Sequence, residues 1–207
     1  MRRLFACVLM MTLLAACAPA GETPEDAAFH LQERYRSAAG FSATVDLTAE
    51  YGDRVYDFTV DALCRKDGET VLTVTAPELI AGITARLAEG ETVLEYDGAA
   101  LSLGDLDGEG LTPVSAIPEL FRQAAMGWMA RCAWGDEERT RLETLCRDPE
   151  AEEGTGAEFL MLFDRETFAP IRAELSRDGV RVLTAQFSDF TFLEMTDDDT
   201  GDGPDLG

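Results

Sequence analysis

Short runs in which apolar and polar residues alternate, each closed by turn residues, dominate this sequence from residue 41 onward. Alternation of this kind is typical of β-strands with one buried face, and links this short cannot join parallel strands. The pattern therefore predicts a meander of about ten antiparallel strands. A further segment, 137–146, fits either a helix or an edge strand, and its strand neighbours favour a strand. The clear runs are 41–49, 56–64, 71–76, two or three hairpins within 82–104, then 158–164, 171–175, 180–187 and 190–193.

Two segments have the spacing of helices instead. Apolar residues recur three to four positions apart over 23–39, which ends at Gly40, and again over 113–130. In the second segment Ser115 is a candidate cap and Pro118 lies near the expected helix start. Strands joined by hairpins together with two helices predict the α+β class and a single domain.

The first 17 residues predict an export signal that ends in a lipidation site. Arg2 and Arg3 precede a short apolar stretch, which is too short to span a bilayer, and small residues lead into Cys17. The sequence Leu-Ala-Ala-Cys at 14–17 resembles the lipobox of bacterial lipoproteins, in which the cysteine thiol receives a diacylglyceryl group. We expect attachment to the extracytoplasmic face of the cell membrane through this lipid. The alternative is an ordinary signal peptide cleaved after Ala18 or Ala20.

Composition divides the chain into four parts and excludes one class of partner. We expect a signal peptide at 1–16, a flexible tether at 17–26, the folded domain at 27–195 and an acidic disordered tail at 196–207. The chain has 40 acidic and 17 basic residues and a net charge of −23. Nucleic acid is therefore not expected as a partner, because like charges repel, whereas a basic protein partner is favoured.

Four short motifs are distinctive in the range 29–193: Pro77–Ile83, Leu94–Gly98, Phe163–Pro170 and Phe187–Phe190. They resemble the LolA-like lipoprotein superfamily, and in particular its small GerS-type and RseB-like members. The resemblance implies a half-open β-barrel of about ten strands whose concave face is apolar and partly closed by helices. Carriers in this superfamily hold acyl chains in that cavity, and GerS-type and RseB-type members act through protein partners.

The apolar strand positions and the second helix supply candidate residues for such a cavity. The alternative for each is ordinary core packing, because apolar strand faces usually fill with side chains. The candidates are Phe58, Val60, Leu72, Val74, Ile83, Leu94, Leu101, Phe121, Trp128, Phe159, Met161 and Phe163.

Other reactive residues give weaker signals. In an oxidising compartment Cys132 and Cys146 are the first candidates for a disulfide; the alternative is that these two and Cys64 are three buried thiols. His30, the only histidine, is expected on a helix surface rather than at a metal. The acidic loops at 105–109 and 198–203 resemble fragments of calcium loops but are expected to be solvated. We therefore expect no metal and no cofactor.

These observations predict a non-enzymatic binding protein. We expect its apolar concave face to bind a protein partner, as a regulator or chaperone of an envelope protein would. The alternative is that the cavity binds or carries acyl chains or lipoproteins. A third reading, an envelope hydrolase with paired carboxylates, has no distinctive spacing to support it.

Overall fold

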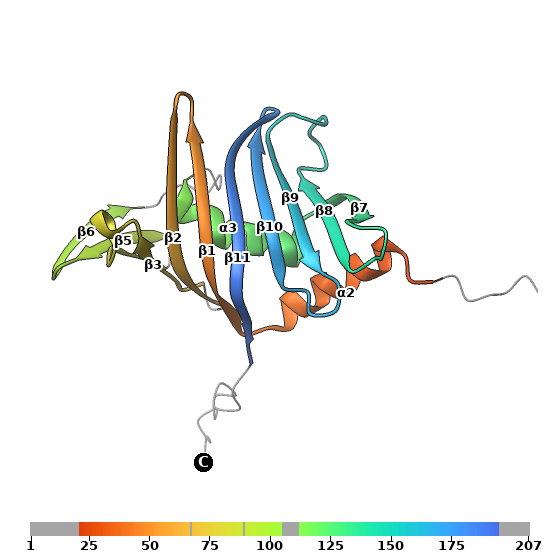
Figure 1. Ribbon diagram of the computed structural model, residues 1–207, viewed down its shortest axis with the longest axis horizontal. Coiled ribbons are helices and arrows are strands. Elements are labelled where there is room, and N and C mark those ends of the chain that lie inside the picture. The colour runs from red at the N-terminus through yellow and green to blue at the C-terminus, as the bar shows by residue number, and fades with distance from the viewer. Residues whose placement is uncertain (1–20, 67, 89, 105–111, 195–207) are drawn as a thin grey trace, which may run out of the picture.

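A computed structural model describes residues 21–66, 68–88, 90–104 and 112–194. This part of the chain forms two α-helices, one 3₁₀ turn and one eleven-stranded sheet that is open rather than closed into a barrel (Figure 1). The predicted α+β class, with a curved antiparallel sheet and two helices, is confirmed. The helices are α2 (Pro24–Ser37) and α3 (Pro113–Met126), and the 3₁₀ turn is η2 (Glu78–Ile80). The strands are β1 (Gly40–Tyr51), β2 (Arg54–Arg65), β3 (Thr70–Ala76), β4 (Thr84–Ala88), β5 (Glu91–Tyr96), β6 (Ala99–Gly104), β7 (Met129–Trp134), β8 (Arg141–Arg147), β9 (Ala157–Asp164), β10 (Pro170–Arg177) and β11 (Val180–Leu193).

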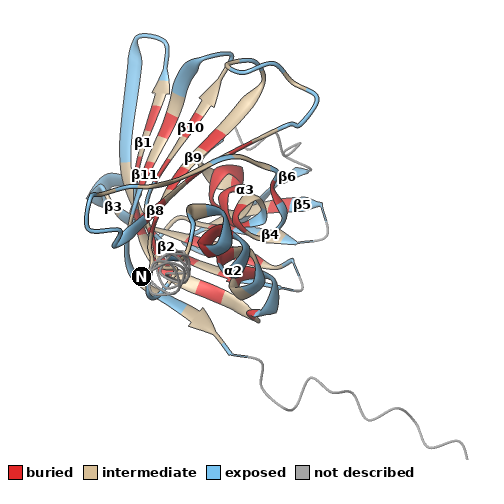
Figure 2. Ribbon diagram, turned by 90° about the vertical axis from the view of Figure 1, so that its right-hand side faces the viewer, coloured by how far each residue is buried: buried red, intermediate tan, exposed pale blue. Residues whose placement is uncertain are grey.

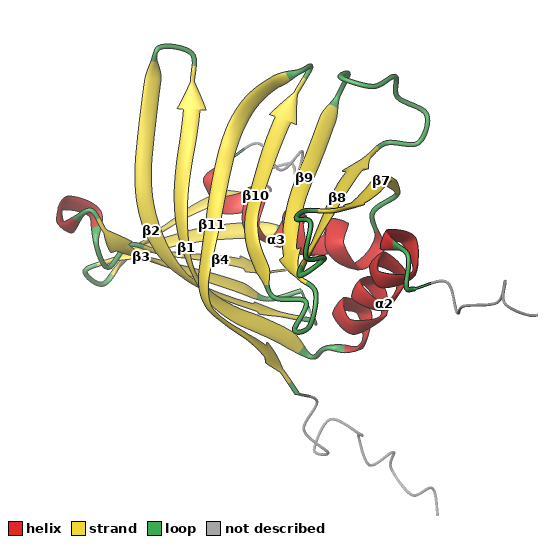
Figure 3. Ribbon diagram, turned by 45° about the vertical axis from the view of Figure 1, so that its right-hand side comes forward, coloured by secondary structure: helices red, strands yellow, loops and turns green. Residues whose placement is uncertain are grey.

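Two meanders meet in the middle of the sheet. The strand order is β6-β5-β4-β3-β2-β1-β11-β10-β9-β8-β7, and every pairing is antiparallel. The long-range pairing of β1 with β11 joins the two halves, with Val45 opposite both Val60 of β2 and Phe187 of β11. Strands β6 and β7 are the two edges. The connection from β6 to β7 passes through α3, which lies behind the central strands (Figure 3).

One face of the curved sheet is buried against the two helices (Figure 2). Alternate residues of β1 are buried from Phe41 to Ala49, as their apolar period requires. From the helices, Leu31, Ile117 and Leu120 are at most 2 % exposed and pack into the same core. The core is thus a single layer between the concave face and the helices.

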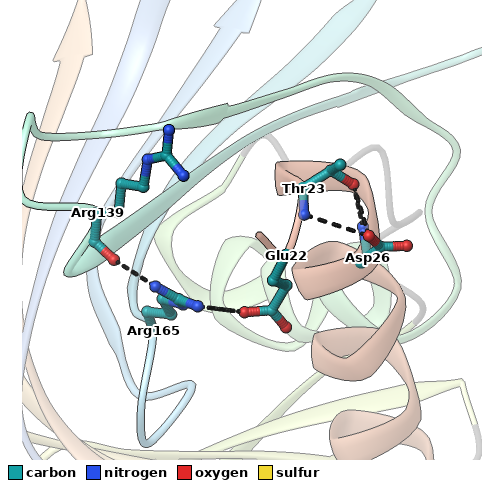
Figure 4. Close-up of polar contacts among 5 residues, drawn as sticks. All are labelled: Glu22, Thr23, Asp26, Arg139 and Arg165. Atoms are coloured by element: carbon teal, nitrogen blue, oxygen red, sulfur yellow. Dashed lines mark hydrogen bonds and ion pairs between the residues drawn. The ribbon is translucent and has the colours of Figure 1, made fainter. Parts of the chain in front are cut away.

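The first helix begins earlier than the predicted domain boundary. Thr23 caps α2 through the backbone N–H of Asp26, the Asp26 carboxylate accepts from the Thr23 backbone, and Pro24 occupies the first turn. Just before the cap, Glu22 pairs with Arg165, which also donates to the carbonyl oxygen of Arg139 at 3.2 Å (Figure 4). Residues 22–26, assigned to the tether on composition, therefore belong to the folded body.

The second helix ends earlier than its apolar stripe suggests. It is capped by Thr112, which forms a capping box with Ser115, so that Ser115 is the third helical residue and Pro118 lies inside the helix. The helix stops at Met126 because Gly127 is extended, and the chain enters edge strand β7 at Met129. This strand is the one that the alternation did not predict. The ambiguous segment 137–146 overlaps strand β8, which runs from Arg141 to Arg147.

An aromatic cluster fastens both helices to the joining strands. The ring of Tyr35 in α2 stacks on Phe121 of α3 with centroids 5.9 Å apart, and meets Phe192 of β11 edge-on at 5.1 Å. The Tyr35 hydroxyl donates to the carbonyl oxygen of Phe168 at 2.9 Å, and burial raises its pKa well above the ordinary value. One side chain thus holds α2 to α3, to β11 and to the β9–β10 turn.

Replacing Tyr35 by Phe should lower the free energy of unfolding by about 1–3 kcal/mol, because the carbonyl of Phe168 loses its donor in a partly buried site. Urea denaturation monitored by circular dichroism measures this change. Tyr96→Phe is the matched control, since Tyr96 is 52 % exposed and its change should stay within about 0.5 kcal/mol. Equal effects of the two substitutions would show that the hydroxyl of Tyr35 has no special role.

Candidate ligand cavity

Most of the residues predicted to line a cavity fill the core instead. Val60, Leu72, Phe121, Phe159, Met161 and Phe163 are buried in it, and Phe58, Val74 and Leu94 are partly buried against it. Ile83 is partly buried, whereas Leu101 and Trp128 are 60 % and 47 % exposed. The centre of the concave face is therefore occupied by the protein's own side chains.

A cavity of about 420 Å³ remains where the C-terminal parts of α2 and α3 approach β1, β2 and β11. This volume lies within the range of small-molecule sites. Its apolar lining includes four aromatic rings, one of which, Phe121, is the only predicted cavity residue among the described lining residues. The apolar lining residues are Tyr35, Ala38, Phe41, Cys64, Pro118, Phe121, Ala125, Met126 and Phe192.

Cationic side chains surround this apolar lining. Arg36, Arg65, Lys66 and Arg122 line the cavity, and its described lining contains no carboxylate. All four are exposed, and Lys66 is the only lysine of the chain. In a protein with 40 acidic residues against 17 basic ones, this grouping is a strong local departure from the overall charge.

Two of the four cations are also held by neighbouring acids. Arg122 forms a two-pronged ion pair with Glu119, which raises the pKa of the Arg122 guanidinium. Arg65 lies 3.5 Å from Glu69. Neither carboxylate is among the described lining residues of the cavity.

Sequence reasoning did not find this site, because its residues come from four separate segments. Arg36 lies in the last turn of α2, Arg65 ends β2 and Lys66 follows it, Arg122 lies on α3, and Phe192 lies near the end of β11. Each of these residues is unremarkable in its own segment. The presence of a single lysine, Lys66, was the only sequence feature that pointed to this site, and it gave no indication of which residues would be its neighbours.

The three cysteines of the body are free thiols, so the expected Cys132–Cys146 bridge is not formed in the structure. The strand register explains this, because Cys132 lies opposite Thr144 and Cys146 lies opposite Met129. Burial raises the pKa of Cys64 and of Cys146 to about 12, and it also raises the pKa of Cys132.

Alkylation of the native protein with iodoacetamide at pH 8.5 should therefore spare Cys64 and Cys146, because only about a thousandth or less of each is thiolate. Cys132, which is half-buried, should react faster, and all three should react in urea. Peptide mass spectrometry gives the extent at each site. Equal native rates at the three thiols, or a disulfide-linked 132–146 peptide, would contradict this description.

The described residues offer little support for metal or hydrolytic chemistry. His30 is exposed and lies 3.6 Å from Glu33, and no group of three or more potential metal ligands gathers within the described ranges. The acidic loops at 105–109 and 198–203 lie outside those ranges. Hydrogen bonds from Thr23, Thr140 and Thr167 lower the pKa of Asp26, Asp136 and Asp164, respectively. A hydrolytic general acid needs a shift in the opposite direction.

Neither helix of the described chain has the length and apolar content needed to cross a bilayer.

Comparisons with known proteins find similarity of fold rather than of sequence. No protein-family model matches the chain, and no curated protein matches its sequence. Similar solved structures include a LolA superfamily protein from Nitrosomonas europaea, at 11 % identity, TM-score 0.42, and coverage of 86 % of this chain and 96 % of that one. A conserved protein from Thermus thermophilus has 10 % identity, TM-score 0.48, and coverage of 84 % and 90 %. A chain of the CwlD amidase–GerS lipoprotein complex from Clostridioides difficile has 12 % identity, TM-score 0.43, and coverage of 82 % and 96 %. The superfamily named from the sequence motifs is thus among the proteins that this fold resembles.

Proposed function

We propose that this protein is an extracytoplasmic lipoprotein that binds the acyl chain of an anionic amphiphile in the cavity between α2, α3 and the sheet. The observation that carries the proposal is the composition of that cavity: its described lining combines apolar side chains with four cations and contains no carboxylate. The apolar concave face predicted to bind a protein partner is largely filled, which moves the proposal toward the acyl ligand.

The two halves of such a ligand match the two kinds of lining. An acyl chain gains about 0.8 kcal/mol for each methylene group that it removes from water, and the aromatic floor formed by Tyr35, Phe41 and Phe192 can cover it. An anionic head group left at the mouth would lie among Arg36, Arg65 and Lys66. A neutral or cationic head group would lose that attraction, so the rim selects for negative charge.

The lipid anchor would hold this cavity close to a source of ligand. If Cys17 carries the diacylglyceryl group, five residue steps separate it from Glu22, which is fixed to the body by Arg165. Five steps span at most about 18 Å, so the body stays near the membrane surface. The net negative charge of the body repels an anionic surface, and the covalent lipid opposes that repulsion.

The test is binding of a fluorescent fatty acid to the mature chain with Cys17→Ser, which removes the lipid. We expect saturable binding, and we expect Lys66→Glu to weaken it about tenfold, because the reversal removes one attraction and adds one repulsion. Arg54→Glu is the matched control: it makes the same kind of change on an exposed residue at the other end of β2, about 36 Å away.

If Lys66→Glu and Arg54→Glu weaken binding equally, the weakening comes from the change in net charge. The cations that line the cavity would then have no specific role in binding. Absence of saturable binding in the unsubstituted chain would overturn the proposal itself. A fatty alcohol of the same chain length should bind more weakly than the acid, and tighter binding of the alcohol would contradict the role of the cations.

A partner protein is the second candidate, and a different observation favours it. All six residues of edge strand β6 are exposed, and its sequence, AALSLG, has neither a charge nor a proline to block pairing with another strand. The sequence that follows contains Asp105, Asp107 and Glu109. We propose that the partner adds an extended basic segment to this edge, since backbone hydrogen bonds and charge would then both be satisfied.

Capture of one basic envelope protein by the mature chain should be lost on Leu101→Asp in β6, because the substitution places a charge on the edge. Val180→Asp serves as the control, since Val180 is similarly exposed, at 64 % against 60 %, but lies in a different hairpin. Affinity purification followed by mass spectrometry reads out both. Retention of the same partner by the Leu101 variant would exclude β6 as its docking edge.

A further inference from the structure

A second cavity, of about 590 Å³, lies on the other side of Arg122, where the end of α3 meets the ends of β8 and β9. Its lining contains three guanidinium groups, those of Arg122, Arg147 and Arg177, and two carboxylates, those of Glu119 and Asp148. It also contains Trp128 and Phe159, two of the residues predicted from sequence to line a ligand cavity. Arg122 and Met126 line both cavities, and the other residues of this lining are absent from the proposed acyl site.

Arg147 is the unusual group in this lining. Its Nη1 donates to the carbonyl oxygen of Ala151 at 2.6 Å, and its guanidinium carbon lies 5.6 Å from the centre of the Trp128 ring. Its Nε is buried and has no acceptor, and none of the ion pairs within the described ranges involves it. A covered cationic N–H without an acceptor is destabilising, because it has lost its water and gained no partner.

Other arginines of the same chain show what this group ordinarily binds. Arg122, Arg165, Arg172 and Arg181 each present Nε and Nη2 together to one carboxylate. This two-pronged contact is the geometry in which arginine recognises carboxylate and phosphate groups. In Arg147 the same pair of nitrogens is left without an acid.

The acids near Arg147 are already engaged elsewhere. Glu158 lies directly opposite Arg147 in the β8–β9 register, but its carboxylate accepts from the backbone N–H of Gly154 at 2.8 Å. Asp148 accepts from the backbone N–H of Glu150 at 2.8 Å. Glu119 is taken by Arg122 and Gln123. Within the described chain none of these carboxylates is paired with Arg147, whose Nε lacks an acceptor.

From this arrangement we infer that the cavity is a binding site for a small organic oxyanion, a carboxylate or a phosphate carried on a flat apolar group. Arg147 supplies the charge through Nε and Nη2, and Trp128 supplies the apolar platform. Because Nε is covered, the guanidinium has to turn toward the cavity to seat both oxygens, and the cost of its unsatisfied N–H favours this turn. A soluble carboxylate and a phosphate head group share this chemistry and are distinguished below.

The experiment follows the two tryptophan indole N–H signals of the ¹⁵N-labelled mature chain with Cys17→Ser, during titration with 1-naphthoate, 1-naphthyl phosphate and the neutral 1-naphthalenemethanol. Trp128 lines the cavity, whereas Trp134 lies under Arg165 and serves as the internal control of folding. We expect either anion to move the Trp128 signal saturably and the neutral compound not to move it. The anion that binds more tightly identifies the source.

Arg147→Gln should weaken the anion by roughly 10- to 100-fold while the Trp134 signal keeps its native position, since a charge-assisted two-pronged contact is lost. Arg147→Lys, which keeps the charge but not the two prongs, should weaken it nearly as much. Arg141→Gln, at the other end of β8, and Lys66→Glu, at the acyl cavity, should leave it unchanged. Three results would overturn the inference. They are an equal shift of the Trp128 signal with the neutral compound, a shift with the anions that persists in Arg147→Gln, and no shift with either anion. If Lys66→Glu abolishes binding of the anions and Arg147→Gln does not, the anions bind in the acyl cavity. That result would also overturn the inference.

Discussion

The structure depends on a mismatch between a wide sheet and the little helix available to cover it. Eleven strands make a sheet about 50 Å across, and one of its faces has to be removed from water. The two helices have 14 residues each and are about 21 Å long. Curvature brings more of the sheet against them, so the centre of the concave face closes around Leu31, Ile117 and Leu120. The helices leave the ends of several strands uncovered, and the cavities lie at this margin on either side of Arg122. The first is at the ends of the central strands β1, β2 and β11, and the second is at the ends of β8 and β9.

Charge makes these margins chemically distinct from the rest of the surface. The chain has more than twice as many acids as bases, and most described arginines are paired with an acid of the protein. Around the first cavity the cations face an apolar lining, and beside the second Arg147 lacks an acidic partner. Binding of an anion in either place would satisfy groups that the fold leaves uncompensated, whereas the filled centre of the sheet has nothing to offer a ligand. The apolar concave face alone is therefore a poor guide to function in this protein.

The elements were predictable where one face of a segment is buried, and less so elsewhere. Phe41 to Ala49 alternate because every second residue enters the core, and the sequence pattern therefore gave β1 directly. Strand β7 was not predicted, because it lies at the edge of the sheet and its residues do not alternate between buried and exposed. Its residues also continue the apolar pattern of α3 beyond Gly127, so the sequence favoured a longer helix. The start of the helix predicted over 23–39 agrees with the observed cap at Thr23, whereas the domain boundary at residue 27 was drawn from composition. The cavity rim was out of reach, since Arg36, Lys66 and Arg122 become neighbours only through tertiary packing.

Native mass spectrometry of the mature chain, isolated from envelope extracts without added lipid, shows whether the cavity between α2, α3 and the sheet holds an anionic acyl amphiphile. We expect a fraction of the molecules to carry one noncovalently bound compound in addition to any lipid on Cys17. Denaturation should release this compound, and its mass should be that of a fatty acid or another anionic acyl amphiphile. We also expect Ala125→Trp, which fills the cavity from α3, to remove that compound from a protein that remains folded. Absence of a noncovalent acyl compound from the native chain would contradict the proposed binding. Retention of that compound by the Ala125→Trp variant would contradict the proposed site.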